Sequence, residues 1–166
     1  MQLTEVKAEL EKFAKHVIKQ ARTNLSKRKK NSSKRLYNSL GYNINANEER
    51  VNVIFQMEDY GNFQDEGVSG TKTKYKTPYR YKSKMPPTKA FSQWVVRKGL
   101  KGVRDEKGKF IARKSLQYLI ARSVFLHGIK PSMFFTRPFN QAFDKLEPEL
   151  QDKFGIDIEN SIIDFE

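Results

Sequence analysis

Few side chains in this sequence have the types and spacing that catalysis requires. The two histidines, His16 and His127, stand far apart, and cysteine is absent, which excludes a thiol nucleophile and a cysteine-rich zinc site. Acidic residues occur as neighbours, such as Glu48-Glu49 and Asp65-Glu66, and adjacent carboxylates on turns do not define an acid–base pair. We therefore expect a protein without enzymatic activity, and no cofactor, metal site or small-molecule substrate.

Basic side chains interleaved with tyrosine are the best candidates for binding chemistry. Residues 72–114 hold 15 basic and 2 acidic side chains, so their net charge of +13 equals that of the whole protein. Lysine and arginine neutralise phosphate groups, and tyrosine rings stack on bases, so the segment suits nucleic acid. A solvated loop that becomes ordered against a neighbouring subunit explains the composition equally well. The candidate contacts are Lys72, Lys74, Tyr75, Lys76, Tyr79, Arg80, Tyr81, Lys82 and Lys84, with Arg137 further along the chain.

Length and composition indicate the class of protein. With 166 residues, 37 % of them hydrophobic, the chain is predicted to form a single domain over residues 1–166, with a basic insertion at about 68–114 and an acidic C-terminal tail at about 147–166. No apolar run approaches the length of a membrane span, and no apolar core of a signal peptide is visible. We therefore expect a soluble protein that is made in a cytosol and does not bind membranes.

Hydrophobic periodicity predicts helices in the first 40 residues. Apolar side chains recur every three or four positions over residues 2–27, which is typical of an amphipathic helix. Thr4 is a plausible cap for this helix. Ser33 can cap a second, short helix over residues 34–40.

The next segment alternates between apolar and polar side chains. This pattern, over residues 41–46 and again over 50–56, predicts two strands of an antiparallel hairpin. One face of the hairpin should pack on the N-terminal helix while the other faces water. The inward face comprises Tyr42, Ile44, Val51, Val53 and Phe55.

The rest of the chain predicts helices around one long loop. A helical turn over residues 58–67 precedes residues 68–87, whose few apolar groups indicate a functional loop or a segment that orders on binding. Helices are predicted from 88 to 98, from 115 to 127 and from 136 to 146, followed by a docked acidic tail. The helix from 115 to 127 should turn Leu116, Leu119, Ile120 and Val124 inward. These elements predict an α+β protein: a small antiparallel sheet packed by a long N-terminal helix and C-terminal helices, with a long basic insertion arm.

Three separated segments of the chain carry distinctive motifs. The first is the long N-terminal helix with the short element at 33–40 that leads directly into a hairpin. The second is residues 60–67 (Tyr-Gly-Asn-Phe-Gln-Asp-Glu-Gly), an aromatic–acidic–glycine step just after the predicted strands. The third is residues 130–139 with Ala142 and Phe143, in which Arg-Pro-Phe opens the last predicted helix. Together these motifs resemble those of the neck or tail-completion proteins of tailed bacteriophages, which build the head–tail connector.

The resemblance implies both a structure and a place of action. It covers residues 1–67 and 128–146, and typical members carry a shorter loop where this chain has residues 68–127. Such proteins are non-enzymatic α+β subunits of the virion neck or tail region, made in the host cytoplasm. They assemble as homo-oligomeric rings with other neck, portal or tail proteins, and genomic DNA passes through the bore. The Arg-Pro-Phe run also has a physical role of its own: Pro138 should fix the start of the last helix, Phe139 should anchor it in the core, and Arg137 should lie exposed for contact.

Ring closure requires heterologous contacts, in which one patch meets a different patch on the next copy. The opposite charges of residues 72–114 and of residues 142–166, which hold 2 basic and 8 acidic side chains, suit such a contact. The basic arm then reaches either the adjacent subunit or the DNA in the bore.

Two other functions stay open at this point. A sequence-tolerant DNA- or RNA-binding protein acting free in the host cytoplasm would also explain the charge. Residues 116–128 and 129–143 could form a helix–turn–helix with Arg137 on the reading helix, although that helix would begin with apolar residues that give few donors to base edges. A small nuclease would need a metal or histidine site that we cannot assemble from this sequence.

Overall fold

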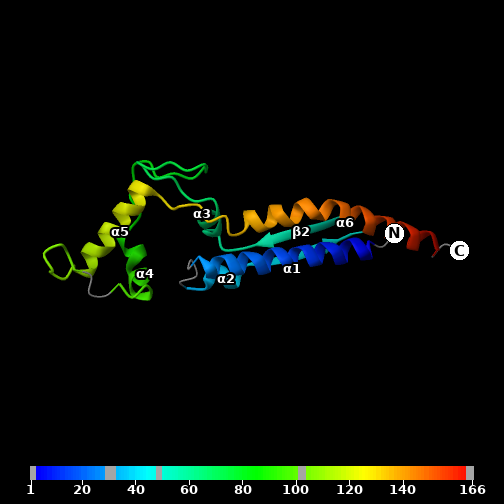
Figure 1. Ribbon diagram of the computed structural model, residues 1–166, viewed down its shortest axis with the longest axis horizontal. Coiled ribbons are helices and arrows are strands. Elements are labelled where there is room, and N and C mark those ends of the chain that lie inside the picture. Colours follow the sequence, from blue (N-terminus) through cyan, green and yellow to red (C-terminus); the bar gives the residue numbers. More distant parts are fainter. Residues whose placement is uncertain (1–2, 29–32, 48–49, 101–103, 164–166) are drawn as a thin grey trace. The chain divides into compact units, whose positions relative to one another are not determined.

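The computed structural model describes residues 3–28, 33–47, 50–100 and 104–163 of the chain. Its fold class is α+β, as predicted: the described residues contain a two-stranded antiparallel sheet packed by helices (Figure 1). The chain divides into two compact units. We call residues 1–31, 35–59 and 134–166 the α/β unit, and residues 32–34 and 60–133 the basic unit. The basic insertion expected at 68–114 lies within the second of these.

Helix α1 (Thr4–Lys27) confirms the helix predicted over residues 2–27. The threonine expected as its cap is instead its first helical residue, and the preceding Leu3 makes no side-chain capping bond. The periodic apolar stripe is the buried face of the helix. It consists of Phe13, Ala14, Val17, Ile18, Ala21 and Leu25.

The cap of α1 comes from the far end of the sequence. The carboxylate of Asp157 accepts hydrogen bonds from the backbone N–H groups of Glu5 and Val6, each at 3.0 Å. These donors have no partner inside the helix, and an anion at this end also interacts favourably with the helix dipole. A residue more than 150 positions away therefore does what Thr4 was expected to do.

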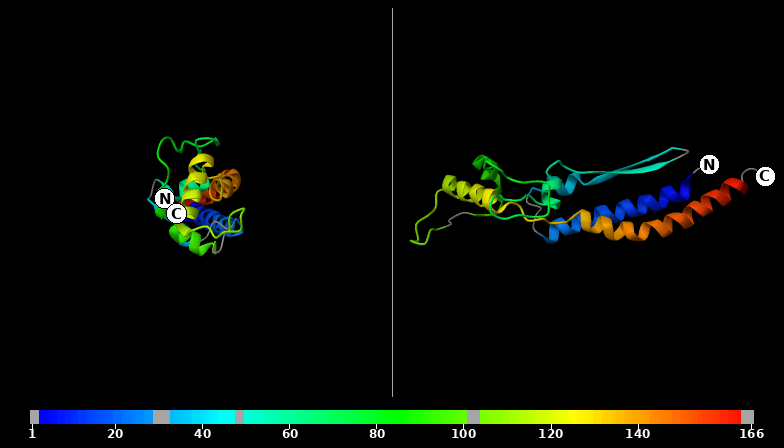
Figure 2. Two further views of the ribbon diagram at one scale, coloured as in Figure 1. Left: turned by 90° about the vertical axis from the view of Figure 1, so that its left-hand side faces the viewer. Right: turned by 90° about the horizontal axis from the view of Figure 1, so that it is seen from above.

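Helix α6 (Thr136–Ile163) runs antiparallel to α1 and beside it (Figure 1). The predicted helix ended at residue 146, but α6 continues through Pro148. Proline removes one N–H donor and bends a helix, and α6 is visibly curved (Figure 2). Leu146 and Asp157, on either side of the proline, are buried, so packing within the unit stabilises the continued helix. As far as residue 163 the acidic segment is docked, as expected, but as helix rather than as a separate tail.

The predicted hairpin is confirmed as β1 (Gly41–Ala46) and β2 (Val51–Gln56). Tyr42 pairs with Phe55 and Ile44 with Val53, which places their side chains on one face. All five residues expected on the inward face are partly buried, whereas the asparagines between them are exposed. Residues 48–49 of the expected turn lie outside the described residues.

Phenylalanine rings join the hairpin to both long helices. The ring of Phe55 meets those of Phe13, Phe135 and Phe139 edge-on, with centroids 6.1, 5.3 and 5.8 Å apart. Edge-to-face pairs at these distances add to the stabilisation that burial provides. Phe139 therefore occupies the anchoring position expected for it.

The short helix α2 (Arg35–Ser39) leads into the hairpin, as predicted. Its Leu36 is buried in one cluster with Leu25 and Phe134. The guanidinium group of Arg22 donates to the carbonyl oxygens at the end of this helix, at 3.2 Å to residue 37 and 2.8 Å to residue 40. Gly41, the first residue of β1, comes directly after residue 40 in the chain.

The basic unit contains α3 (Gly61–Asp65), η1 (Thr88–Phe91), α4 (Ser92–Arg97) and α5 (Arg113–His127). These elements confirm the predicted helices. The inward position expected for Leu119 is wrong, because this side chain is 47 % exposed and the buried residues of α5 are Gln117 and Ala121. Apolar residues surround α5, so periodicity alone did not identify the face that packs on η1.

Candidate partner-binding surface

The excess positive charge of the chain belongs entirely to the basic unit. This unit holds 18 basic and 4 acidic side chains, whereas the α/β unit holds 14 and 15. Like charges repel one another and oppose compaction. The basic unit is therefore the part of the chain whose charge best suits an anionic partner.

Backbone hydrogen bonds fasten the two ends of the basic unit to each other. Val68 and Ile129 form an antiparallel bridge, and each N–H donates to the other carbonyl at 2.8 Å. The N–H groups of Ser132 and Met133 donate to the carbonyl of Asp65 at 3.0 and 2.9 Å. We call this set of contacts the junction. Because the junction closes the loop, the 60 residues between Val68 and Ile129 begin and end at one place.

Glycine is required where the chain enters the junction. Gly67 has a φ of +79°, and a Cβ atom added there would lie 2.7 Å from Cδ of Pro131. A Cβ at Gly128 would collide with the Val68 carbonyl, and one at Gly70 would collide with the Leu126 carbonyl. Two backbones approach each other here more closely than any side chain permits.

The first half of the predicted loop at 68–87 is organised by one buried serine. The N–H of Ser69 donates to the carbonyl of Tyr79, and the N–H of Tyr81 donates to the carbonyl of Ser69, both at 2.9 Å. The Ser69 hydroxyl donates to the Tyr75 carbonyl at 3.2 Å and accepts the Tyr75 N–H at 3.0 Å. The backbone of this segment is therefore hydrogen-bonded within its own chain rather than left open for a partner.

The tyrosines expected as contacts pack partly inside the unit. The Tyr79 ring lies edge-on to Phe63 with centroids 4.6 Å apart, and the Tyr81 ring lies edge-on to Phe125 at 6.2 Å. Burial raises the pKa of the Tyr81 hydroxyl. Tyr75 is also half-buried. These rings hold the loop in place, and only their remaining faces can meet a partner.

The cations of the loop, by contrast, point into solvent. Lys74 makes a hydrogen bond from Nζ to the carbonyl of Gly70 at 3.3 Å. In the described parts of the chain, no ion pair joins any of these cations to a carboxylate. The exposed set is Lys72, Lys74, Lys76, Arg80, Lys82 and Lys84. An ordered backbone that presents unpaired cations is a preformed polycation, which loses less entropy on binding than a disordered arm would.

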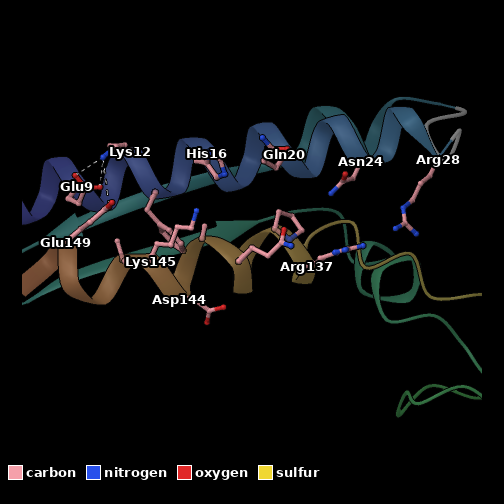
Figure 3. Close-up of a pocket in the computed structure, with 15 residues that line it drawn as sticks. Glu9, Lys12, His16, Gln20, Asn24, Arg28, Arg137, Asp144, Lys145 and Glu149 are labelled. Atoms are coloured by element: carbon pink, nitrogen blue, oxygen red, sulfur yellow. Dashed lines mark hydrogen bonds and ion pairs between the residues drawn. The ribbon is translucent and has the colours of Figure 1, made fainter.

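Arg137 is the one candidate contact that belongs to the α/β unit. It is exposed at the start of α6, where it lines a polar groove of about 860 Å³ with Gln20 and Asn24 of α1 and with Arg28, which follows that helix (Figure 3). The opposite end of this groove is charge-paired, since Lys12 lies 3.0 Å from Glu9 and 3.9 Å from Glu149. The structure therefore gathers nine of the ten predicted contacts in one unit and assigns the tenth to the other.

The carboxyl group of Glu9 has a perturbed acidity. Burial by itself raises its pKa, but the hydrogen bonds with Lys12 and Glu149 and the charges of Lys12 and Lys153 outweigh burial, so the pKa is lowered below its usual value. The charged form of this largely buried carboxylate is thus the stable one.

The two histidines belong to different units. His16 is exposed in the polar groove, and Nδ1 of His127 lies 3.2 Å from the Thr73 hydroxyl at the end of α5. Across the described ranges, no three His, Cys, Asp or Glu side chains are placed to hold a metal ion. Nor does any helix in those ranges have the length and apolar character needed to cross a membrane.

The helix–turn–helix considered from the sequence does not form. Eight residues separate α5 from α6, and the two helices belong to different units. The DNA-binding motif needs two helices packed across a turn of three or four residues.

Sequence reasoning missed the organising role of Ser69. The signal that could have revealed it is the pair of flanking glycines, Gly67 and Gly70, because two glycines so close together indicate tight backbone packing. Comparisons of the chain with protein-family models, with curated proteins and with solved structures found no match.

Proposed function

We propose that this chain is a non-enzymatic structural subunit of a tailed-phage virion. It forms part of the head–tail connector, as a neck, tail-completion or tail-terminator ring through which DNA passes. It is made in the host cytoplasm and assembles with copies of itself and with other neck, portal or tail proteins.

The junction is the observation that carries the proposal. Two segments of the resemblance, residues 60–67 and 130–139, are separated by more than 60 residues in the sequence. Residues of both meet there, through the hydrogen bonds from Ser132 and Met133 to Asp65 and through the close approach of Gly67 to Pro131, which leaves no room for a Cβ atom. Two motifs that are far apart in the sequence thus contribute to one packed element, which supports the resemblance better than two unconnected motifs would.

The junction also accounts for the departure from the family's usual length. An insertion whose ends are hydrogen-bonded to each other can be long without separating the elements on either side, since closing a longer loop adds little entropic cost. The basic unit is then a specialisation carried by a connector subunit.

Location in the virion tests the proposal. Antibodies against the purified protein should label the head–tail junction of virions of the phage that encodes the chain. Deleting the gene should leave filled heads that are not joined to tails. Virions that lack the protein, or deletion mutants that still join heads to tails, would refute the proposal.

The unpaired cations of the basic unit favour one second candidate, a sequence-tolerant nucleic-acid-binding protein. If the six exposed cations of the loop each neutralise a phosphate, the affinity for duplex DNA should fall with salt at a logarithmic slope of about −5. Fluorescence anisotropy of a labelled duplex across a salt series measures this slope. A steep slope together with absence from virions would favour the free binder over the connector subunit.

A further inference from the structure

An apolar groove on the α/β unit is open to solvent. Val6 of α1 and Phe143, Leu146, Leu150 and Phe154 of α6 line a hollow of about 420 Å³. Phe143 and Phe154 are 54 % and 45 % exposed. A contiguous exposed patch of large apolar side chains is typical of an interaction site.

One acidic side chain, that of Glu147, also lines this groove. None of the ion pairs in the described parts of the chain involves Glu147. The segment around it, residues 142–166, holds 8 acidic and 2 basic side chains. The groove therefore suits an occupant that is apolar and positively charged.

The basic unit exposes a surface of that composition on α5. Tyr118 and Leu119 are 49 % and 47 % exposed. Arg122 is exposed one turn further on, and no ion pair among the described residues involves it. Residues three and four apart lie on the same side of a helix, so these three side chains form one apolar and cationic face, which we call the α5 face.

We propose that the groove on α6 receives the α5 face of a second copy of this chain. This inference rests on the proposed function, because it describes how neighbouring subunits join in a ring. Leu119 and Tyr118 enter among the phenylalanines of the groove, and Arg122 pairs with Glu147. Because the contact removes water from part of this ion pair, the pair contributes more to the specificity of the contact than to its affinity.

Charge disfavours the symmetric alternative, in which two α6 grooves cover each other. That packing would bring two acidic segments together and leave both Glu147 carboxylates unpaired. The contact between groove and α5 face is heterologous, so a pair of copies keeps one free groove on one copy and one free α5 face on the other. Such a contact propagates from copy to copy until a ring closes.

Truncation of one side chain on each surface tests the contact. Phe154→Ser removes an aromatic group from the groove, and Leu119→Ser removes the corresponding group from the α5 face. Because both residues are about half exposed, neither change should unfold the chain, which circular dichroism can verify. Sedimentation velocity at low salt should show assembly of the wild type and at least a tenfold higher dissociation constant for each variant. Ile156→Ser is the matched control, since Ile156 is also exposed on α6 but lies on another side of the helix, and it should assemble like the wild type.

Mixing the two variants distinguishes a heterologous contact from a symmetric one. The Phe154→Ser chain retains its α5 face, and the Leu119→Ser chain retains its groove, so the mixture should form 1:1 dimers that grow no further. Glu147→Lys and Arg122→Glu should each weaken assembly, and the chain that carries both changes should recover it.

Four outcomes overturn the inference: a wild type that stays monomeric, single variants that assemble normally, a mixture without dimers, or charge reversals that do not compensate. None of these results depends on where the protein lies in a virion. Failure of this contact is therefore distinguishable from failure of the proposed function, which is decided by labelling of the head–tail junction.

Discussion

Replacing Asp157 tests whether the α/β unit depends on a cap supplied from the opposite end of the chain. This residue is 2 % exposed, and its carboxylate accepts two backbone hydrogen bonds of 3.0 Å from the first turn of α1. A hydrogen bond to a charged group contributes about 1.5–3 kcal/mol, and a capping residue typically contributes about 1 kcal/mol. Because the exposed helix end lets water replace part of the loss, we expect Asp157→Ala to lower the free energy of unfolding by about 2–4 kcal/mol. Asp157→Asn keeps one acceptor oxygen and should cost about half as much.

Two probes can measure this effect in one denaturation experiment. Far-UV circular dichroism in urea follows the helices, including α1 and α6. The single tryptophan, Trp94, lies in α4 of the basic unit, so its fluorescence reports on that unit. If the units unfold independently, Asp157→Ala should shift the transition that only circular dichroism detects and leave the Trp94 transition in place.

The matched control is Asp152→Ala. Asp152 is an exposed carboxylate of the same helix, and its loss should change the unfolding free energy by less than about 0.5 kcal/mol. Should Asp157→Ala behave like this control, the carboxylate does not stabilise α1, and the reasoning from hydrogen-bond geometry is wrong.

Three further predictions concern other parts of the chain. Phe139→Ala removes a ring from the aromatic cluster and should destabilise the α/β unit by about 3 kcal/mol in the same urea titration; an unchanged midpoint contradicts the anchoring role. Ser69→Ala removes the hydroxyl that donates to and accepts from Tyr75, so limited proteolysis should cleave the loop at 68–82 faster than in the wild type, while equal rates show that the backbone bonds alone suffice. Glu9 has a lowered pKa in the folded state, so its contribution to stability is present above the ordinary glutamate pKa of 4.5 and is lost as the pH falls through the lower folded value. As the pH falls from 4.5 through the folded pKa, stability should therefore decline less steeply in Glu9→Gln than in the wild type, and an unchanged slope would show that this carboxylate is not the group responsible.

Local patterns were sufficient for most of the secondary structure. The stripe of α1 and the alternation of β1 and β2 each repeat over short distances, and each is read from side chains that lie on one face. The inward face of the hairpin followed from the same alternation, since Phe55 could only point toward the helix if Val53 did. Charge segregation was likewise evident before folding, because the basic and acidic side chains are clustered along the chain itself.

The candidate site was predicted in part. Lysines and arginines of the loop were identified from their density, and they are exposed because charged groups avoid burial. Their neighbours Tyr79 and Tyr81 could not be assigned in the same way, because a tyrosine serves equally as a packed ring or as an exposed one. Phe63 and Phe125, which decide the matter, are distant in the sequence.

What the sequence left open depends on contacts between distant residues. Asp157 caps α1 only because α6 continues through Pro148, and local propensity argues against that continuation. Ser69 organises its loop only when Tyr75 and Tyr79 fold back onto it, and the junction exists only when Asp65 meets Ser132. Such pairings cannot be predicted from the residues taken singly, because each pairing is favourable only after the rest of the unit has assembled. Composition and hydrophobic periodicity therefore determined the helices, the strands and the distribution of charge along the chain. Tertiary packing determined which charged side chains cap a helix and which remain exposed to solvent.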